Sequence, residues 1–144
     1  MKIGVASDHA GFEYKSKIAA LLRKKGFEVV DYGTYSEESC DYSDFGHALG
    51  NAIDNGEVEA GVAFCGTGNG ISMTLNKHQK VRAALCWGTE LARLAKAHNN
   101  ANVIVMPARF ISYQMATAIV NKWFATEFEG GRHQRRIDKM PLAK

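Results

Sequence analysis

A glycine-rich stretch, Cys65-Gly66-Thr67-Gly68-Asn69-Gly70, constrains the fold of this chain more than any other part of the sequence. The residues before it, Ala60 to Phe64, are apolar or small, and Ile71 to Leu75 after it can begin a helix. The pattern therefore predicts a buried strand, a tight turn and a helix. Glycine at alternate positions permits positive φ angles and removes the Cβ groups that would keep a ligand from the backbone. Because unpaired N–H groups and the helix dipole favour negative charge at a helix N-terminus, the turn is a candidate anion-binding site.

Cys65 stands at the mouth of this predicted site. The field that attracts an anion also favours a thiolate over a thiol, so Cys65 is a candidate nucleophile or base. The alternative is a structural role, since free cysteines are mostly small buried hydrophobic residues.

The spacing of the turn excludes two other phosphate-binding motifs. Ile71 occupies the position of the last glycine in a dinucleotide fingerprint. The Lys and the Ser or Thr of a Walker loop are absent after Gly70. Ile71 also stands where a cysteine phosphatase would have an arginine, which disfavours that class of enzyme.

Strand and helix patterns alternate along the rest of the chain. Apolar runs predict five strands, at about Lys2–Ala6, Phe27–Asp31, Ala60–Phe64, Val81–Cys86 and Val103–Met106. Apolar residues at helical spacing predict helices between and after them, at about Phe12–Lys25, Phe45–Ile53, Ile71–Lys77, Thr89–His98 and Ser112–Thr126. The basic residues of the first helix are predicted to face solvent, and these are Lys15, Lys17, Arg23, Lys24 and Lys25.

This alternation predicts an α/β fold with a single doubly wound domain, Rossmann-like or flavodoxin-like. The expected sheet has five strands and is mainly parallel, and an extended tail follows the domain. We place the domain at residues 1–126 and an Arg-rich tail, completing a site at a subunit interface, at residues 127–144.

Composition and cysteine usage narrow the class of protein further. The chain has 144 residues, 46% of them hydrophobic, and no apolar run approaches the roughly 20 residues of a membrane helix. Because the first residues enter a strand rather than a signal peptide, we expect a cytoplasmic protein. Cys40, Cys65 and Cys86 form no CxxC pair, which argues against a disulfide framework and a zinc knuckle. A net charge of +3 gives little support for a nucleic-acid partner.

Candidate binding residues follow the predicted strands, because ligands of parallel sheets bind near the carboxyl ends of the strands. Residues in these positions are Asp8 and His9, Asp31 to Gly33, Cys65 to Gly70, Trp87 and Gly88, and Arg109. His98 instead lies at the end of a predicted helix and of its apolar stripe. A histidine there is a core residue, a group stabilised by the helix dipole, or a functional residue.

The tail contains an arginine cluster, Arg132-His133-Gln134-Arg135-Arg136. If this segment is helical, Arg132 and Arg136 are one turn apart and form a clamp suited to phosphate. A solvated basic tail and an RNA-binding segment are the alternatives. Gly130 and Gly131 precede the cluster and allow the tail to reach a partner subunit.

Taken together, these motifs closely resemble the type B ribose-5-phosphate isomerases, a family that also includes galactose-6-phosphate isomerase subunits. The resemblance covers nearly the whole chain in order. It rests on Ser7-Asp8-His9-Ala10-Gly11, Asp41-Tyr42, Cys65-Gly66-Thr67-Gly68-Asn69-Gly70-Ile71-Ser72, Asn76-Lys77, Val81-Arg82-Ala83-Ala84, His98-Asn99 and Gly130-Gly131-Arg132-His133.

The resemblance implies isomerisation of ribose 5-phosphate to ribulose 5-phosphate, a step of the non-oxidative pentose phosphate pathway, without a metal or an organic cofactor. By similarity, His98 opens the furanose ring, Cys65 carries a proton between C2 and C1, and the turn from Gly66 to Gly70 holds the enediolate oxygens. Thr67 and Ser72 add hydroxyl contacts to this chemistry.

The family also implies where the rest of the substrate binds. It assigns the phosphate to His9, Arg109, Arg132 and Arg136. It assigns sugar hydroxyl contacts to Asp8, Tyr42 and Asn99. Under this assignment the glycine turn holds the enediolate. Without the resemblance, the sequence would predict that the turn binds the phosphate.

A homodimer with sites at the subunit boundary, and in some members a tetramer, is a further implication of the resemblance. Ser43 departs from the family pattern, which often has proline there, and this makes the Tyr42 loop less rigid. Three alternatives stay open: an isomerase of allose or galactose 6-phosphate, a non-catalytic sugar-phosphate-binding subunit, and a redox or nucleotide-binding module. The presence of both Cys65 and His98 favours an active isomerase.

Overall fold

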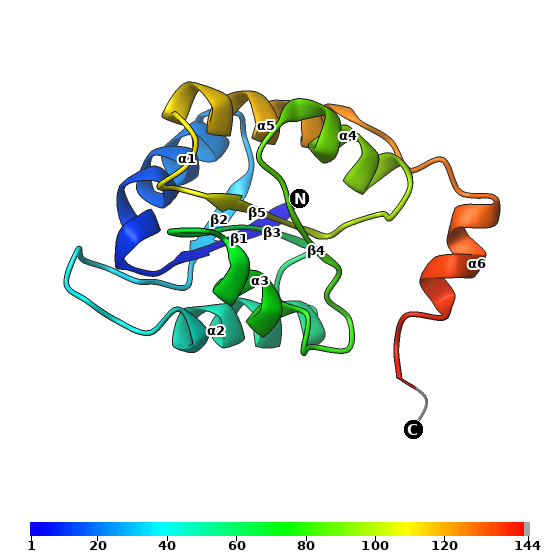
Figure 1. The fold of residues 1–144 in the computed structure, drawn as a ribbon, viewed down its shortest axis with the longest axis horizontal. Helices are drawn as coiled ribbons and strands as arrows, with labels where there is room; N and C mark the ends of the chain where they lie inside the picture. The colour runs from blue at the N-terminus through cyan, green and yellow to red at the C-terminus, as the bar shows by residue number, and fades with distance from the viewer. Residues whose placement is uncertain (143–144) are drawn as a thin grey trace.

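Five strands and six α-helices make up the structure, a computed structural model that describes residues 1–142 (Figure 1). The strands are β1 (Lys2–Ser7), β2 (Glu28–Asp31), β3 (Ala60–Cys65), β4 (Ala83–Leu85) and β5 (Val103–Pro107). The helices are α1 (Phe12–Lys24), α2 (Tyr42–Asp54), α3 (Asn69–Leu75), α4 (Thr89–Ala97), α5 (Tyr113–Ala125) and α6 (Arg132–Asp138), with a short 3-10 turn, η1 (His9–Gly11). All strand pairs are parallel, so the predicted α/β class and five-stranded sheet are confirmed.

The strand order, β2-β1-β3-β5-β4, places β3 at the centre of the sheet. The chain moves outward from β1 to β2 and then crosses back over β1 to reach β3. Helices α1, α4 and α5 cover one face of the sheet, and α2 and α3 cover the other (Figure 1). Each connection between parallel strands is right-handed. Because the chain adds strands first toward one side of the sheet and then toward the other, its helices fall on both faces.

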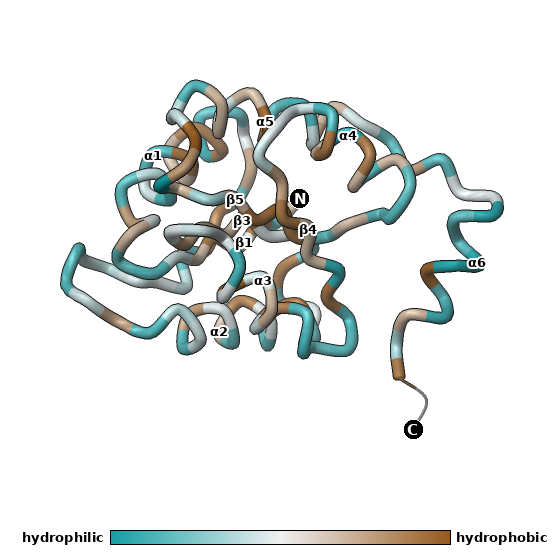
Figure 2. Tube along the Cα trace, in the orientation of Figure 1, coloured by the Kyte–Doolittle hydropathy of each residue, from teal (hydrophilic) through white to brown (hydrophobic). Residues whose placement is uncertain are grey.

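The core consists of two apolar layers on either side of the sheet. Alternate residues of β3 serve them: Val62 and Phe64 pack toward α1, α4 and α5, whereas Ala63 and Cys65 pack toward α2 and α3. Buried strands in a parallel sheet are apolar on both faces, and the brown centre of Figure 2 shows this pattern. Full burial of each large apolar side chain stabilises the fold by about 1.5–3 kcal/mol.

Lys15 corrects one prediction, because it does not lie on the solvated face of α1. Its side chain is fully buried, and Nζ donates to both carboxylate oxygens of Asp31 at 2.8 Å and to the carbonyl of Thr34 at 2.5 Å. The ammonium group also lies 5.2 Å from the centre of the Phe12 ring. The pair anchors α1 to the end of β2, so the first helix of the domain is fixed by charge as well as by apolar packing.

The tail leaves the domain after α5 and forms α6, so the condition under which Arg132 and Arg136 lie one turn apart is met. In Figure 1, α6 stands beside the domain at the β4 side of the sheet. A cavity of about 770 Å³ lies between the tail and the domain, lined by Ile137 and Met140 on one side and Val81 and Asn99 on the other. The predicted tail segment 127–144 ends in two residues, 143 and 144, that lie outside the described residues.

Among residues 1–142, none of the helices has both the length and the apolar character needed to cross a membrane.

Replacing Lys15 with Met should lower the free energy of unfolding by about 3 kcal/mol. The change leaves Asp31 without its cation, but the cost stays near the lower end of the range for a broken buried pair because Asp31 keeps contact with water. Urea unfolding monitored by circular dichroism measures the difference. Lys17→Met is the matched control, since Lys17 pairs with Glu13 on the exposed face of the same helix and its loss should change little. Equal effects of the two substitutions would contradict a structural role for the Lys15 pair.

Candidate active site

Cys65 is the last residue of β3, at the carboxyl edge of the sheet's central strand. Its side chain packs with Ile71 and Val105 in the layer below α2 and α3, and only 4% of the residue is exposed. The structure thus places Cys65 directly before the turn, as expected, but its side chain is buried rather than exposed, because strand alternation directs it toward the layer under α2 and α3.

The turn that follows Cys65 carries a set of free amide groups. Among residues 1–142, the N–H groups of Gly66, Thr67, Gly68 and Gly70 donate to no protein acceptor, whereas Asn69 N–H donates to the Thr67 hydroxyl at 3.2 Å. Gly68 has a φ of 78°, in the left-handed region that favours glycine. Unpaired backbone donors at the start of a helix are suited to an oxyanion, which agrees with the predicted anion site.

Two side chains from other elements pack directly on this turn. A methyl group at Gly70 would lie 2.4 Å from Tyr42 Cζ, so the tyrosine ring rests on the glycine. A methyl group at Gly66 would lie 3.3 Å from both Cδ and Nη1 of Arg109. Tyr42 begins α2 and Arg109 follows β5, so the structure brings both predicted residues to the same edge as Cys65.

Asp8 and His9 follow β1 and complete this group of residues. Oδ1 of Asp8 accepts the N–H groups of Ala10 and Gly11 at 3.0 and 3.2 Å, which fixes the carboxylate as an acceptor. Nδ1 of His9 accepts the N–H of Cys40 at 3.3 Å, so a neutral His9 carries its proton on Nε2 and can donate to an anion. Of the remaining predicted residues, Thr67 and Asn69 are exposed, and Ser72 is half-buried on α3.

The other predicted residues, His98, Asn99, Arg132 and Arg136, lie at the opposite edge of the sheet. His98 caps the carboxyl end of α4. The loop from His98 to β5 lies beside the start of β3, because Asn102 O accepts the Gly61 N–H at 2.8 Å. Cys65 lies at the other end of this strand. The strand has six residues and so spans about 20 Å. One chain therefore does not bring His98 and Cys65 together.

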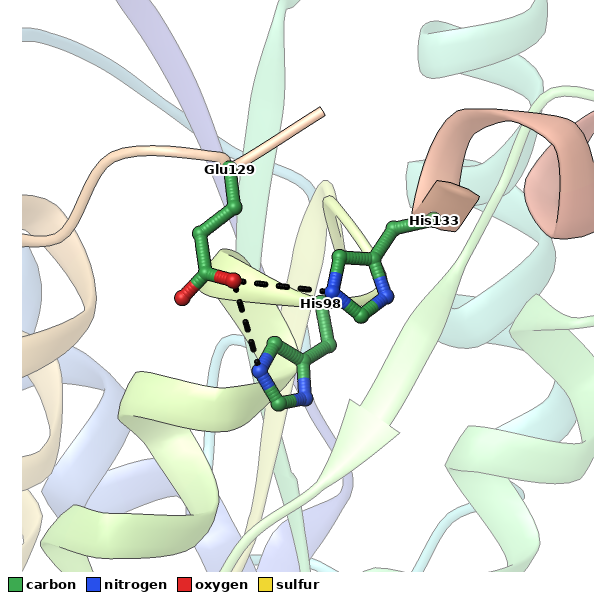
Figure 3. Close-up of side chains that lie close together, drawn as sticks. All are labelled: His98, Glu129 and His133. Atoms are coloured by element: carbon green, nitrogen blue, oxygen red, sulfur yellow. Dashed lines mark ion pairs between the residues drawn. The ribbon is translucent and has the colours of Figure 1, made fainter. Parts of the chain in front are cut away.

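His98 belongs instead to a cluster with Glu129 and His133 (Figure 3). Oε1 of Glu129 lies 3.7 Å from Nε2 of His98 and 3.5 Å from Nε2 of His133, and the two imidazole rings stack with their centres 4.4 Å apart. Burial, together with the charges of His98 and Arg132, lowers the pKa of His133 below its usual value. Glu129 and His133 were not among the predicted site residues, although the sequence contains a signal for them. It places an acid four residues before a histidine across two glycines.

Comparison with known proteins decides the family. Residues 3–140 match the family model described as Ribose/Galactose Isomerase. The chain belongs to the ribose/galactose isomerase family. The resemblance drawn from the motifs is thereby confirmed, and the protein is an enzyme of the isomerase class.

Members of this family with solved structures are close to the chain along its whole length. It is 48% identical to a ribose 5-phosphate isomerase from Thermotoga maritima, with a TM-score of 0.94 and 97% of each chain covered. It is 41% identical to ribose-5-phosphate isomerase B from Mycoplasma genitalium with bound ribulose-5-phosphate, with a TM-score of 0.92 and 96% and 93% of the two chains covered. It is also 40% identical to ribose-5-phosphate isomerase B of Escherichia coli (strain K12), over 95% of this chain and 92% of that protein.

Gly68→Ala should destabilise the protein by about 1–3 kcal/mol more than Gly56→Ala, because an added methyl at Gly68 overpacks the core. Both glycines have left-handed φ angles, 78° and 76°, so the backbone strain of alanine is shared. Only Gly68 is enclosed: its added methyl would lie 2.3 Å from Leu85 Cδ1, whereas no heavy atom lies within 4 Å at Gly56. Thermal unfolding of the two variants measures the difference, and equal stability would contradict tight packing of the turn.

Proposed function

We propose that this chain interconverts ribose 5-phosphate and ribulose 5-phosphate at sites shared between two copies. The observation that carries the proposal is that Cys65 ends β3 directly before a turn whose backbone N–H groups, that of Asn69 apart, donate to no protein acceptor among residues 1–142. An aldose–ketose isomerase needs a base next to stabilised negative charge on oxygen, and this edge of the sheet contains both kinds of group. The bound ribulose-5-phosphate of the Mycoplasma genitalium relative supports the same substrate.

In the proposed reaction, Cys65 takes the proton from C2 of the open-chain aldose and returns it to C1. The resulting enediolate carries its charge on O1 and O2, which the amides of Gly66, Gly68 and Gly70 stabilise. Each well-placed donor of this type contributes about 3–4 kcal/mol to lowering the barrier. The hydroxyl groups of Thr67 and Ser72 lie on the same turn and helix and can relay the hydroxyl proton between O2 and O1.

Other groups at this edge hold the rest of the substrate. Asp8 keeps one carboxylate oxygen bonded to its own turn and offers the other to a sugar hydroxyl. The Tyr42 hydroxyl, above Gly70, is placed for a second hydroxyl contact. His9 and Arg109 supply donors for the phosphate, and a bidentate guanidinium suits its geometry.

The division of the predicted residues between two edges is the reason for proposing a second copy. His98, Asn99, Arg132 and Arg136 reach Cys65 only if a partner supplies them, in a homodimer or a larger assembly of such pairs. The partner-facing surface has apolar groups to bury, since Trp87 and Phe110 are 58% and 73% exposed. They line a groove of about 420 Å³ together with Thr67, next to the glycine turn. Exposed aromatic groups gathered at one place are typical of an interaction site.

Mixing two inactive variants tests whether the site is shared. Cys65→Ala and His98→Asn should each lack activity on cyclic ribose 5-phosphate. When the two variants are mixed, dissociated and allowed to reassociate, they should recover about a quarter of wild-type activity. Half of the randomly formed dimers contain both variants, and one of the two sites in each such dimer is intact. Ketose formation measures the recovery. The two variants kept unmixed are the controls, and a mixture as inactive as its components would contradict a shared site.

One assay tests both the substrate and the base: ketose formation by the enzyme after a chelator has removed metal ions. We expect turnover of ribose 5-phosphate in preference to allose 6-phosphate and galactose 6-phosphate, and we expect Cys65→Ala to abolish it while phosphate still binds. Cys86→Ala is the matched control. Burial raises the pKa of Cys86 to about 12, so this thiol is not a base at neutral pH, and its removal should spare activity. Preference for a six-carbon substrate would instead identify an isomerase of allose 6-phosphate or galactose 6-phosphate. No turnover of any of the three sugar phosphates would indicate a non-catalytic subunit.

A further inference from the structure

Three elements converge at the amino-terminal edge of the sheet. The N–H of Glu129 donates to Ala97 O at 2.9 Å, which fixes the connector from α5 along the end of α4. Gly130 and Gly131 both have positive φ angles, 72° and 58°, and the chain turns back there. His133, in the first turn of α6, is thereby stacked on the ring of His98 (Figure 3).

The side chains of this cluster have the chemistry of metal ligands. His98, Glu129 and His133 each offer one ligand atom, and these atoms lie within 4.8 Å of one another. Ligands bound to zinc at about 2.0–2.2 Å in tetrahedral geometry are separated by about 3.3–3.5 Å. The two distances from Oε1 of Glu129 to the histidine nitrogens, 3.5 and 3.7 Å, are close to this spacing.

His133 provides an independent observation. Its side chain is 8% exposed, and among residues 1–142 its Nε2 has no hydrogen-bond partner. Buried polar atoms are normally satisfied, and a lone pair without a partner is suited to a bound ion.

We propose that His98, Glu129 and His133 form a binding site for a divalent transition-metal ion such as Zn²⁺, and that this ion withdraws His98 from the isomerase reaction. Two nitrogens and one oxygen favour zinc over magnesium or calcium, which prefer oxygen ligands. A water molecule completes four-coordination. The second half of the proposal rests on the proposed function, in which His98 opens the sugar ring in a partner's site.

Binding requires one local movement. The two rings lie 12° from parallel, and stacked rings do not direct both lone pairs at one point. His98 must therefore turn about its Cβ–Cγ bond. Its side chain is 39% exposed, and none of the hydrogen bonds in residues 1–142 involves its ring, so the turn breaks no such bond. Coordination would also occupy the imidazole lone pair that His98 needs for proton transfer, which links occupancy to inhibition.

The surrounding charges limit the affinity. The positive charges of Arg132 and Arg136 act on His133, and Glu129 interacts with Arg93. These guanidinium groups repel a cation and offset the single negative charge of Glu129. We therefore expect a reversible site that responds to the free metal concentration, weaker than the closed four-ligand sites of structural zinc.

Titration of the chelator-stripped protein with Co²⁺, followed by visible absorption, tests the site without reference to activity. Wild type should develop the absorption of four-coordinate cobalt without a thiolate charge-transfer band, and Zn²⁺ should displace it. Glu129→Gln and His133→Gln should each weaken binding by about tenfold or more, because loss of even a supporting group around a metal costs roughly 10–100-fold. His47→Gln is the matched control, since His47 belongs to a different histidine pair, with His78 at 2.8 Å, and its loss should leave binding unchanged.

Circular dichroism of the metal-free variants separates ligand loss from loss of the helix. Glu129 is 52% exposed, and glutamine has nearly the same size as glutamate. Glu129→Gln should therefore keep the fold. The site is overturned if cobalt shows no four-coordinate spectrum, if both cluster variants bind as wild type does, or if His47→Gln removes binding.

Inhibition is measured separately, as the activity lost on adding Zn²⁺. The lost fraction should be large for wild type and small for Glu129→Gln at the same free zinc concentration. Metal binding without inhibition would uphold the site and overturn the claim that the ion withdraws His98 from the reaction. Isomerase activity without metal binding would uphold the proposed function and overturn the site.

Discussion

The common direction of the five strands is the constraint on which the rest of the structure depends. Parallel strands place all their carboxyl ends at one edge of the sheet, and the helices that connect them end at the other. Cys65 ends a strand, and Asp8, His9 and Arg109 follow strands, so these residues gather at the first edge. His98 follows a helix and lies at the second edge. The separation of these groups is a consequence of topology rather than of any local interaction.

The carboxyl edge is prepared for anionic chemistry by its backbone. The turn after β3 leaves amide donors free, and Gly66 and Gly70 allow Arg109 and Tyr42 to approach closely. The buried Lys15–Asp31 pair fixes α1 against the end of β2, in the same part of the fold as Asp8. Candidate binding groups and supporting structure are thus built from residues that are distant in sequence and close in space.

Much of this arrangement follows from the sequence, for identifiable reasons. Apolar runs and glycine punctuation were sufficient to predict five strands and the turn after β3, because these signals are local. The burial of Lys15 was not predictable in this way, since its partners Asp31 and Thr34 belong to another segment. The same limit applies to Glu129 and His133, which become neighbours of His98 only through tertiary contacts. Motifs predicted a set of candidate site residues, but not that these residues occupy two edges of the sheet.

The two neighbours of β3 become available at different times during synthesis of the chain. This strand pairs on one side with β1, from the start of the chain, and on the other with β5, which begins only at Val103. During synthesis the end of β3 therefore lacks one neighbour until more than two thirds of the residues have left the ribosome. Contacts of this range are slow to form because a long loop must close first. The surroundings of Cys65 are thus completed late, after the segment that contains Cys65 has itself emerged.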